Sequence, residues 1–101
     1  MNAFVRAWRY RVAAAQRAEF ERRYAADGDW ARLFARGDGY LGTQLLRDAT
    51  DPARYLTLDR WRSAGDWLAF KAAHAADYAA LDRLCEALTS DEEDLGDYLE
   101  S

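Results

Sequence analysis

Hydrophobic and polar residues alternate along much of the chain, and this alternation predicts β-strands, because successive side chains of a strand point to opposite faces. We predict strands over three such stretches, which are residues 4–12, 40–47 and 55–61. The turn-forming pair Asp51-Pro52 lies between the second and third stretches, so these two should pair as an antiparallel hairpin. Gly42, inside the second stretch, predicts a β-bulge or a point of close approach.

Between the first and second predicted strands, the hydrophobic residues have helical spacing. Residues 13–26 are good helix formers, and Phe20 and Tyr24 share one face of the predicted helix. A short second helix follows, from which Trp30 and Phe34 are expected to point into the core. The first half of the chain therefore predicts a strand, a helical segment and a strand.

A longer helical region is predicted from Ala64 to Leu88. Ser63 and Asp66 have the spacing of a capping box at its start. A bend is expected at residues 75–77, where the alanine-rich segment has little to anchor it. Four side chains at spacings of three and four fall on one face of this helix: Trp67, Phe70, His74 and Tyr78. We expect any active site to include this face.

The C-terminal residues complete the predicted fold. The acidic run at residues 91–94 is typical of a solvated turn, and residues 95–99 predict a short last strand. The order strand, helix, strand, strand, helix, strand is the split β-α-β arrangement of a ferredoxin-like α+β fold, with the helices on one face of an antiparallel sheet. The length of 101 residues predicts one domain, spanning 1–101.

The sheet face without helices is expected to need a partner. We predict that this face carries Trp8, Tyr10, Tyr55 or Trp61, which would make a large exposed apolar patch. A second copy of the chain is the simplest partner, so we expect a homodimer. Aromatic residues make up 14% of the chain, more than one small core requires, which favours a pocket or a subunit contact lined with rings.

Charge and hydropathy exclude several classes of partner. The net charge is −4 and the arginines are scattered, which argues against nucleic acid. No apolar run approaches the roughly 20 residues that would span a membrane, and the amino terminus lacks a signal-peptide pattern, so we predict a soluble, cytoplasmic protein. Abundant alanine and a single lysine, Lys71, are typical of GC-rich bacterial coding.

Several chemistries are excluded by the residues available. One histidine and one cysteine cannot form a tetrahedral zinc site within a chain. Cys85 has no partner for a disulfide and shares a helical face with leucines, so we expect it to be a buried apolar side chain. The segment Gly37-Asp38-Gly39 lacks the context of a phosphate-binding loop, and nothing supports flavin or nicotinamide binding.

Segments spread from about Phe4 to Leu99 resemble the antibiotic biosynthesis monooxygenase superfamily. They are FVRAWRYRV, AEFERRY, GDWARLF, GYLGTQLL, YLTLDRWRS, AHAADYAALD and LGDYLE. The most specific are the strand end that runs from Asp59 to Ser63 and the pair His74-x-x-x-Tyr78. The resemblance implies a dimeric α+β barrel, in which each subunit keeps its own pocket between helices and sheet. Members of this family differ in function, so the resemblance by itself does not assign an activity.

The first hypothesis that the resemblance implies is a cofactor-independent monooxygenase. A hydroquinone or anthrone that has lost a proton can itself pass an electron to O2, so the protein needs an apolar pocket, a base and a donor for the oxyanion. His74 would be the base, since apolar surroundings favour neutral imidazole, and Tyr78 would hydrogen-bond the substrate oxygen. The expected substrate-binding walls are Trp8, Tyr10, Tyr40, Trp61, Trp67 and Phe70. No cofactor or metal is expected.

Two alternatives remain open. The segment from Phe70 to His74 resembles the helix that carries the axial iron ligand in the haem-degrading branch, which implies haem binding through His74. The chain departs from that branch because Trp8 stands where it has asparagine, and because Trp67 lies closer to the histidine, so haem degradation is less well supported than haem binding. The other alternative is a catalytically silent dimeric ligand-binding domain, in which His74 is an ordinary core residue.

Overall fold

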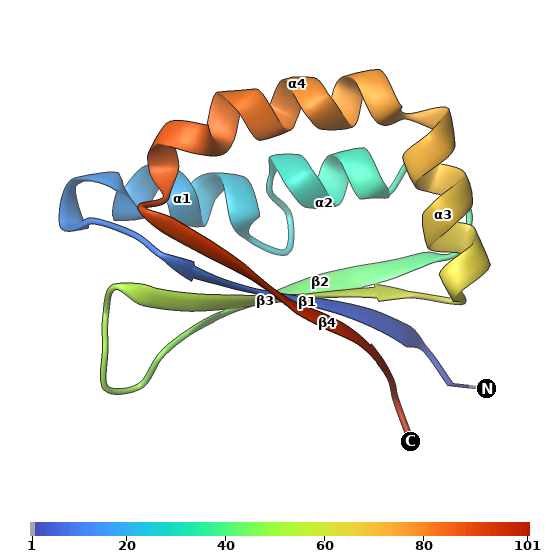
Figure 1. Cartoon of the computed structure of the whole chain (residues 1–101), viewed down its shortest axis with the longest axis horizontal. Helices are drawn as coiled ribbons and strands as arrows, with labels where there is room; N and C mark the ends of the chain where they lie inside the picture. Colours follow the sequence, from blue (N-terminus) through green and yellow to red (C-terminus); the bar gives the residue numbers. More distant parts are fainter. Residues whose placement is uncertain (1) are drawn as a thin grey trace.

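The computed structural model describes residues 2–101 and shows one antiparallel sheet with helices on one of its faces (Figure 1). The strands are β1 (Phe4–Arg11), β2 (Tyr40–Arg47), β3 (Arg54–Trp61) and β4 (Asp91–Leu99). The helices are α1 (Arg17–Tyr24), α2 (Asp29–Phe34), α3 (Ala64–Ala73) and α4 (Ala75–Cys85), with 3-10 turns at Ala14–Gln16 and Glu86–Leu88. No helix among the described residues is long and apolar enough to cross a bilayer.

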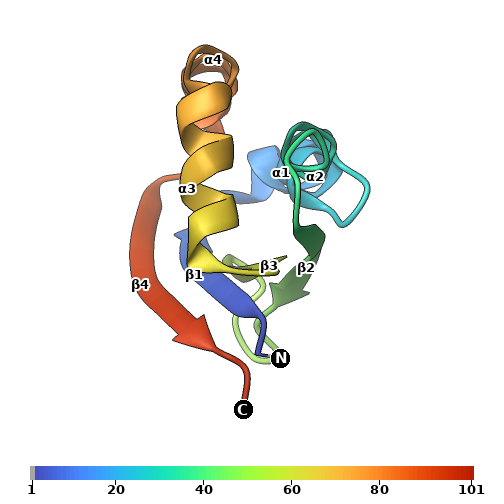
Figure 2. The same cartoon turned by 90° about the vertical axis from the view of Figure 1, so that its right-hand side faces the viewer.

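The sheet has the strand order β2-β3-β1-β4, with each neighbouring pair antiparallel. The α+β, ferredoxin-like fold predicted from the sequence is therefore confirmed. The predicted hairpin is formed by β2 and β3, and the register of that pair shifts between Tyr40 and Gly42, which confirms the bulge. Figure 2 shows the helices grouped above the sheet, with β4 and β2 at its two edges.

The second helical region is divided at His74. The predicted helix cap is confirmed, because the Ser63 hydroxyl accepts a hydrogen bond from the Asp66 amide at 3.1 Å. The Asp66 carboxylate accepts its hydrogen bonds from Arg62, so only the Ser63 half of the predicted capping box is formed. His74 has φ −120° and ψ 28°, which ends α3, and α4 begins at the next residue. The break lies one residue before the predicted bend and redirects the chain, so that α4 runs back above α1 and α2 (Figure 1).

The prediction of a solvated turn at residues 91–94 is wrong, because β4 begins at Asp91. These acidic residues pair with β1 from Arg11 back to Trp8, and Arg9 makes an ion pair with Glu93. Their side chains are exposed, as suits an edge strand, where charge is tolerated and solvent reaches both sides. The last strand is accordingly longer than the predicted 95–99.

The predicted facing of the aromatic side chains on β1 and β3 is also wrong. Tyr10, Tyr55 and Trp61 are buried under the helices, and Trp8 packs against the same core. Trp61 has no exposed surface and its ring contacts Phe34 at a centroid distance of 5.8 Å. Both faces of β1 mix apolar and charged residues, so alternation alone could not decide which face is covered. The outer sheet face instead carries aliphatic side chains and one tyrosine, namely Leu41, Leu46, Leu56, Leu58, Leu95 and Tyr98.

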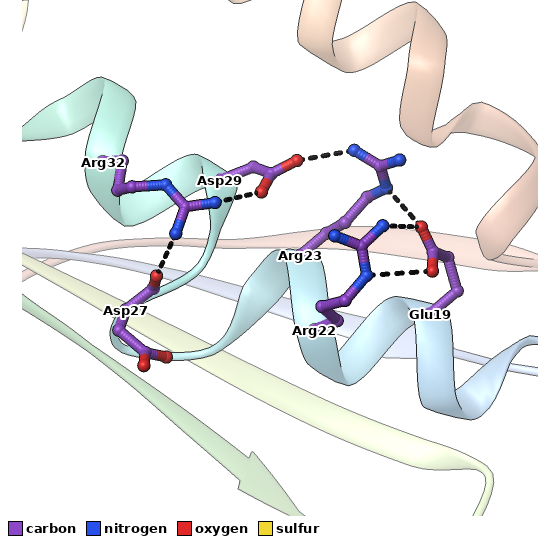
Figure 3. Close-up of polar contacts among 6 residues, drawn as sticks. All are labelled: Glu19, Arg22, Arg23, Asp27, Asp29 and Arg32. Atoms are coloured by element: carbon purple, nitrogen blue, oxygen red, sulfur yellow. Dashed lines mark hydrogen bonds and ion pairs between the residues drawn. The ribbon is translucent and has the colours of Figure 1, made fainter.

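The helices α1 and α2 are joined by a network of charged side chains (Figure 3). Arg23 lies at its centre, donating one hydrogen bond to Glu19 on α1 at 2.9 Å and another to Asp29 on α2 at 2.5 Å. Its side chain is 18% exposed, so this interaction is less screened than a surface ion pair. The network fixes the angle between the two helices that bear Tyr24 and Trp30, which are buried beneath them.

We predict that Arg23→Met lowers the free energy of unfolding by about 1 kcal/mol, because a partly buried charge-assisted contact between two helices is lost. Arg22→Met is the matched control, since Arg22 also pairs with Glu19 but is 60% exposed and contacts one helix only. We expect the control to cost no more than a few tenths of a kcal/mol, in line with exposed pairs. Urea denaturation of both variants measures the difference, and equal losses would contradict the bridging role of Arg23.

Candidate functional site

A cavity of about 280 Å³ lies between the helix-facing side of the sheet and the helices. Aromatic rings from four elements form its walls, including Trp8 on β1, Tyr24 on α1, Trp30 on α2 and Tyr78 on α4. Its polar and charged lining comes mainly from the sheet. It is near the lower end of the range for small-molecule pockets, about 300–1,000 Å³, which suits a compact ring system.

A row of polar side chains crosses the sheet beneath this cavity. The register places Thr43 of β2 opposite Asp59 of β3, then Arg6 of β1, then Asp97 of β4. The first three of these residues line the cavity. The sheet therefore presents a carboxyl group and a guanidinium group side by side to a largely aromatic space.

The Asp59 carboxyl group is held by a short relay of hydroxyl groups. Thr43 Oγ1 donates to Asp59 Oδ1 at 2.7 Å, and the Tyr40 hydroxyl lies 2.5 Å from the same Oγ1. Because Thr43 gives its only hydroxyl hydrogen to Asp59, Tyr40 must be the donor in the second contact. The relay fixes one Asp59 oxygen through β2, and the second oxygen has no hydrogen bond within residues 2–101.

Burial raises the pKa of Asp59 to about 6, and this effect exceeds the opposing influence of the Thr43 hydrogen bond and the Arg6 charge. At neutral pH the carboxylate is mostly ionised, yet it binds a proton more tightly than an ordinary aspartate. These are the properties of a general base for a weakly acidic substrate in an apolar site.

Two cationic side chains lie on the same cavity. Arg6 places its guanidinium carbon 4.5 Å from the centre of the Trp67 ring. Lys71 places Nζ 3.7 Å from the centre of the Tyr78 ring. Burial lowers the pKa of Lys71, and the nearby Arg6 charge acts in the same direction. Both side chains thus bring positive charge to the aromatic wall.

Tyrosine hydroxyl groups at the cavity stay protonated. Burial raises the pKa of Tyr78 to about 12, despite the opposing charge of Arg6. Burial also raises the pKa of Tyr10, whose hydroxyl lies 3.0 Å from the Thr57 hydroxyl. Each can donate a hydrogen bond, and neither serves as a base near neutral pH.

The structure brings together only some of the residues predicted from the sequence. Trp8, Tyr10 and Tyr78 line the cavity. The other predicted wall residues pack beside it in the core instead, namely Tyr40, Trp61, Trp67 and Phe70.

His74 does not line the cavity. It lies at the break between α3 and α4, with its ring 5.1 Å from that of Phe70, and its link to Tyr78 is the backbone hydrogen bond from the Tyr78 amide at 2.9 Å. The residues present therefore do not fit a haem held in this cavity by His74. The roles of His74 as base or iron ligand stay predictions.

Sequence reasoning missed Asp59, Thr43, Arg6 and Lys71 as site residues. A signal was present for Asp59, because the period of two in 55–61 places it on the same face as Tyr55, Thr57 and Trp61. A carboxyl group on the covered face of a central strand is unusual and indicates function. Recognising it required knowing which face of β3 the helices cover.

Comparison with known proteins identifies the relatives of this fold. The family model for antibiotic biosynthesis monooxygenases matches residues 3–81. SnoaB, a cofactor-independent oxygenase from Streptomyces nogalater, aligns over 100% of this chain and 93% of its own, with a TM-score of 0.75 and 23% identity. A conserved protein from Methanosarcina mazei aligns over 100% and 95%, with a TM-score of 0.72 and 12% identity. Identities this low indicate a shared fold alone. No curated protein matches the chain in sequence.

We predict that Asp59→Asn stabilises the protein at pH 7.5. Because the pKa of Asp59 is raised in the folded state, its ionisation opposes folding, and this cost is fully present above about pH 6. The amide is neutral at every pH, so the free energy of unfolding should rise by about 1–2 kcal/mol at pH 7.5. The gain should shrink as the pH falls from 6 to below 3.8, the ordinary pKa of the group, where the wild-type carboxyl is protonated in both states.

Urea denaturation at several pH values measures this effect. Asp27→Asn is the matched control, because Asp27 is exposed and its side chain makes no hydrogen bond within residues 2–101. A variant of Asp59 that is less stable than the wild type at pH 7.5 would show that the carboxylate is not strained by burial.

Proposed function

The chain belongs to the antibiotic biosynthesis monooxygenase family, and we propose that it oxidises an electron-rich aromatic phenol, of the hydroquinone or anthrone type, with O2 and without a bound cofactor. The observation that carries this proposal is the Asp59 carboxyl group, placed in an aromatic cavity with its pKa raised to about 6. The similarity in fold to SnoaB, which is a cofactor-independent oxygenase, is consistent with it.

The reaction begins with proton transfer from the substrate to Asp59. The resulting anion passes one electron to O2, which gives a substrate radical and superoxide, and these combine to form a carbon–oxygen bond. The peroxide takes up a proton and loses water, so one oxygen atom of O2 stays on the ring carbon and the other leaves in water. Substrate and O2 supply all the electrons, so the chain itself need only bind, orient and move protons.

The aromatic walls favour a flat, uncharged ring system. Trp8 and Trp30 line the cavity, where a flat ring could pack against them, and Tyr78 can donate a hydroxyl hydrogen to a substrate oxygen. Excluding water from this space strengthens every charge interaction within it. The substrate would lie with its acidic oxygen toward the sheet, where Asp59 is fixed by Thr43.

His74 is the competing candidate for the base. Its position outside the cavity lining favours Asp59, since a base must come within hydrogen-bond reach of the proton it removes. The haem alternative depends on the same histidine. Substitutions of Asp59 and of His74, made separately, distinguish these hypotheses.

We also propose that the protein is a homodimer joined through the outer sheet face. Helices leave this face uncovered (Figure 2), and its side chains include Leu46, 42% exposed, and Tyr98, 56% exposed. Leu46 and Leu56 also line a second hollow on this side, of about 340 Å³, together with Leu95. A second copy would present the same apolar residues and bury both sets by two-fold symmetry.

We predict that Asp59→Asn lowers the rate of O2 uptake with a hydroquinone or anthrone substrate by about 100-fold or more, as expected for loss of a general base. The wild-type rate should fall as the pH drops below about 6, because the carboxylate must be ionised to accept the proton. An oxygen electrode measures both effects, and the identity of the oxidised product is checked by mass spectrometry with labelled O2.

Two control variants sharpen this experiment. Asp27→Asn removes an exposed carboxylate and should leave the rate unchanged. His74→Ala should also retain most of the activity if Asp59 is the base. A rate lost in His74→Ala and kept in Asp59→Asn would return the role of base to His74.

Haemin titration of the wild type and His74→Ala tests the haem alternative. Binding through His74 would produce a Soret shift in the wild type that is absent in His74→Ala.

We predict that Leu46→Glu converts the dimer to a monomer, because a carboxylate would be buried in an apolar contact. Leu68→Glu is the matched control, since Leu68 is 63% exposed on α3, on the side of the sheet that the helices cover. Light scattering coupled to size-exclusion chromatography gives the mass of each. A wild-type protein that is monomeric at micromolar concentration would overturn the proposal of a homodimer.

A further inference from the structure

Two cationic groups converge on the cavity from different layers of the fold. Arg6 rises from the floor of the cavity on β1, and Lys71 comes from the last turn of α3. The Trp67 ring lies near both, 4.5 Å from the Arg6 guanidinium carbon and 5.5 Å from Lys71 Nζ. Aromatic surface thus replaces part of the water around both cations.

The hydrogen-bond donors of these two groups are largely uncommitted. The carboxylates nearest to Arg6 are Asp94 and Asp97, at 3.6 and 3.8 Å, which are ion-pair contacts too long for hydrogen bonds. Lys71 makes neither an ion pair nor a side-chain hydrogen bond within residues 2–101. By contrast, Arg62 at the surface makes two hydrogen bonds to the carboxylate of Asp66.

A cation with free donors, held against a cavity wall, is a binding site for an anionic oxygen. An anion that enters the cavity would accept hydrogen bonds from these uncommitted donors, and the aromatic surroundings strengthen its attraction to both cations. The proposed reaction generates such an anion, first on the substrate oxygen and then on O2. Electrostatic groups already in place where charge develops are the largest contribution to many enzymatic rates.

We propose that Arg6 and Lys71 form an oxyanion pair, which binds the ionised oxygen of an otherwise uncharged phenol while Asp59 holds the proton removed from it. This inference deepens the proposed function and rests on it. The proton stays within the cavity, so Asp59 becomes neutral as the substrate becomes anionic. The net charge of the site is unchanged in the transfer.

The remaining charges of the cavity define the substrate class. Asp82 and Glu92 also line it, so with Asp59 it has three carboxyl groups and two cations. Burial raises the pKa of Glu92, and the Asp82 charge acts in the same direction, which shows that negative charge already accumulates on that side. A substrate that carries a carboxylate would add to this repulsion. The cavity therefore favours a neutral phenol over an aromatic acid.

A nitrophenol that does not react with O2 tests the pair without turnover, because its ionised form absorbs at longer wavelength. We expect the pKa of 4-nitrophenol to fall by about one unit when it binds the wild type, the size of effect expected for an opposite charge within a few ångströms. The shift should be largely lost in Lys71→Gln and Arg6→Gln and kept in Lys71→Arg. Arg36→Gln, at an exposed residue that pairs with Asp77, is the control and should keep it.

Lys71→Gln is the decisive variant, because Lys71 makes no ion pair within residues 2–101 whose loss would disturb folding, whereas Arg6 contacts β4. An unchanged shift in Lys71→Gln, or a bound probe that stays neutral, would overturn the pair. The substrate class is tested by affinity: 4-nitrophenol should bind more tightly than 4-nitrobenzoate, and the reverse order would overturn it. A shift that depends on Lys71 in a protein that consumes no O2 with any phenol would uphold the pair and refute the proposed monooxygenase.

Discussion

The packing of two aromatic clusters, one at each end of the sheet, determines where a ligand can bind. At one end Trp61 packs with Phe34, Trp67 and Phe70 beneath α3. At the other, Tyr10 and Tyr55 pack with Phe20 and Tyr24 beneath α1, and Phe20 stacks on Tyr24 at 4.2 Å. The rings hold the helices above the sheet at both ends, and Trp30 contacts members of both clusters. The middle of the sheet carries Trp8 and polar side chains such as Arg6 and Asp59, and the cavity lies above them.

This arrangement places polar side chains of the sheet against a cavity with aromatic walls. Asp59 is costly to the fold in its ionised form, and the same cost makes it a stronger base than an exposed aspartate. Tyr40 and Thr43 hold the carboxylate in one orientation through side chains of the neighbouring strand. Stability and chemistry are therefore opposed at this one residue, a relation that is common in enzyme sites.

The sequence was sufficient to predict the order of the elements, because alternation and helical spacing are local signals. It was not sufficient to predict the covered face of β1 and β3, since that depends on how the helices pack. The residues of the candidate site were incompletely predicted for the same reason. His74 was prominent as the only histidine, whereas Asp59 looked like one of many charged residues until the register placed it beside Arg6. The β4 strand was predicted too short because the charges of an edge strand resemble those of a turn.

The acidic edge of the sheet limits how these molecules can aggregate. An edge strand exposes unpaired backbone groups that can add a strand from another chain. On β4, however, four consecutive carboxylates run from Asp91 to Asp94, and a second β4 laid beside it would bring like charges together. The bulge at Leu95 of β4, opposite Ala7 and Trp8, further disturbs the straight edge that such pairing needs. Extension of the sheet through β4 into fibres is therefore disfavoured. This protection matters because strands rich in tyrosine and tryptophan have a high propensity for β-pairing.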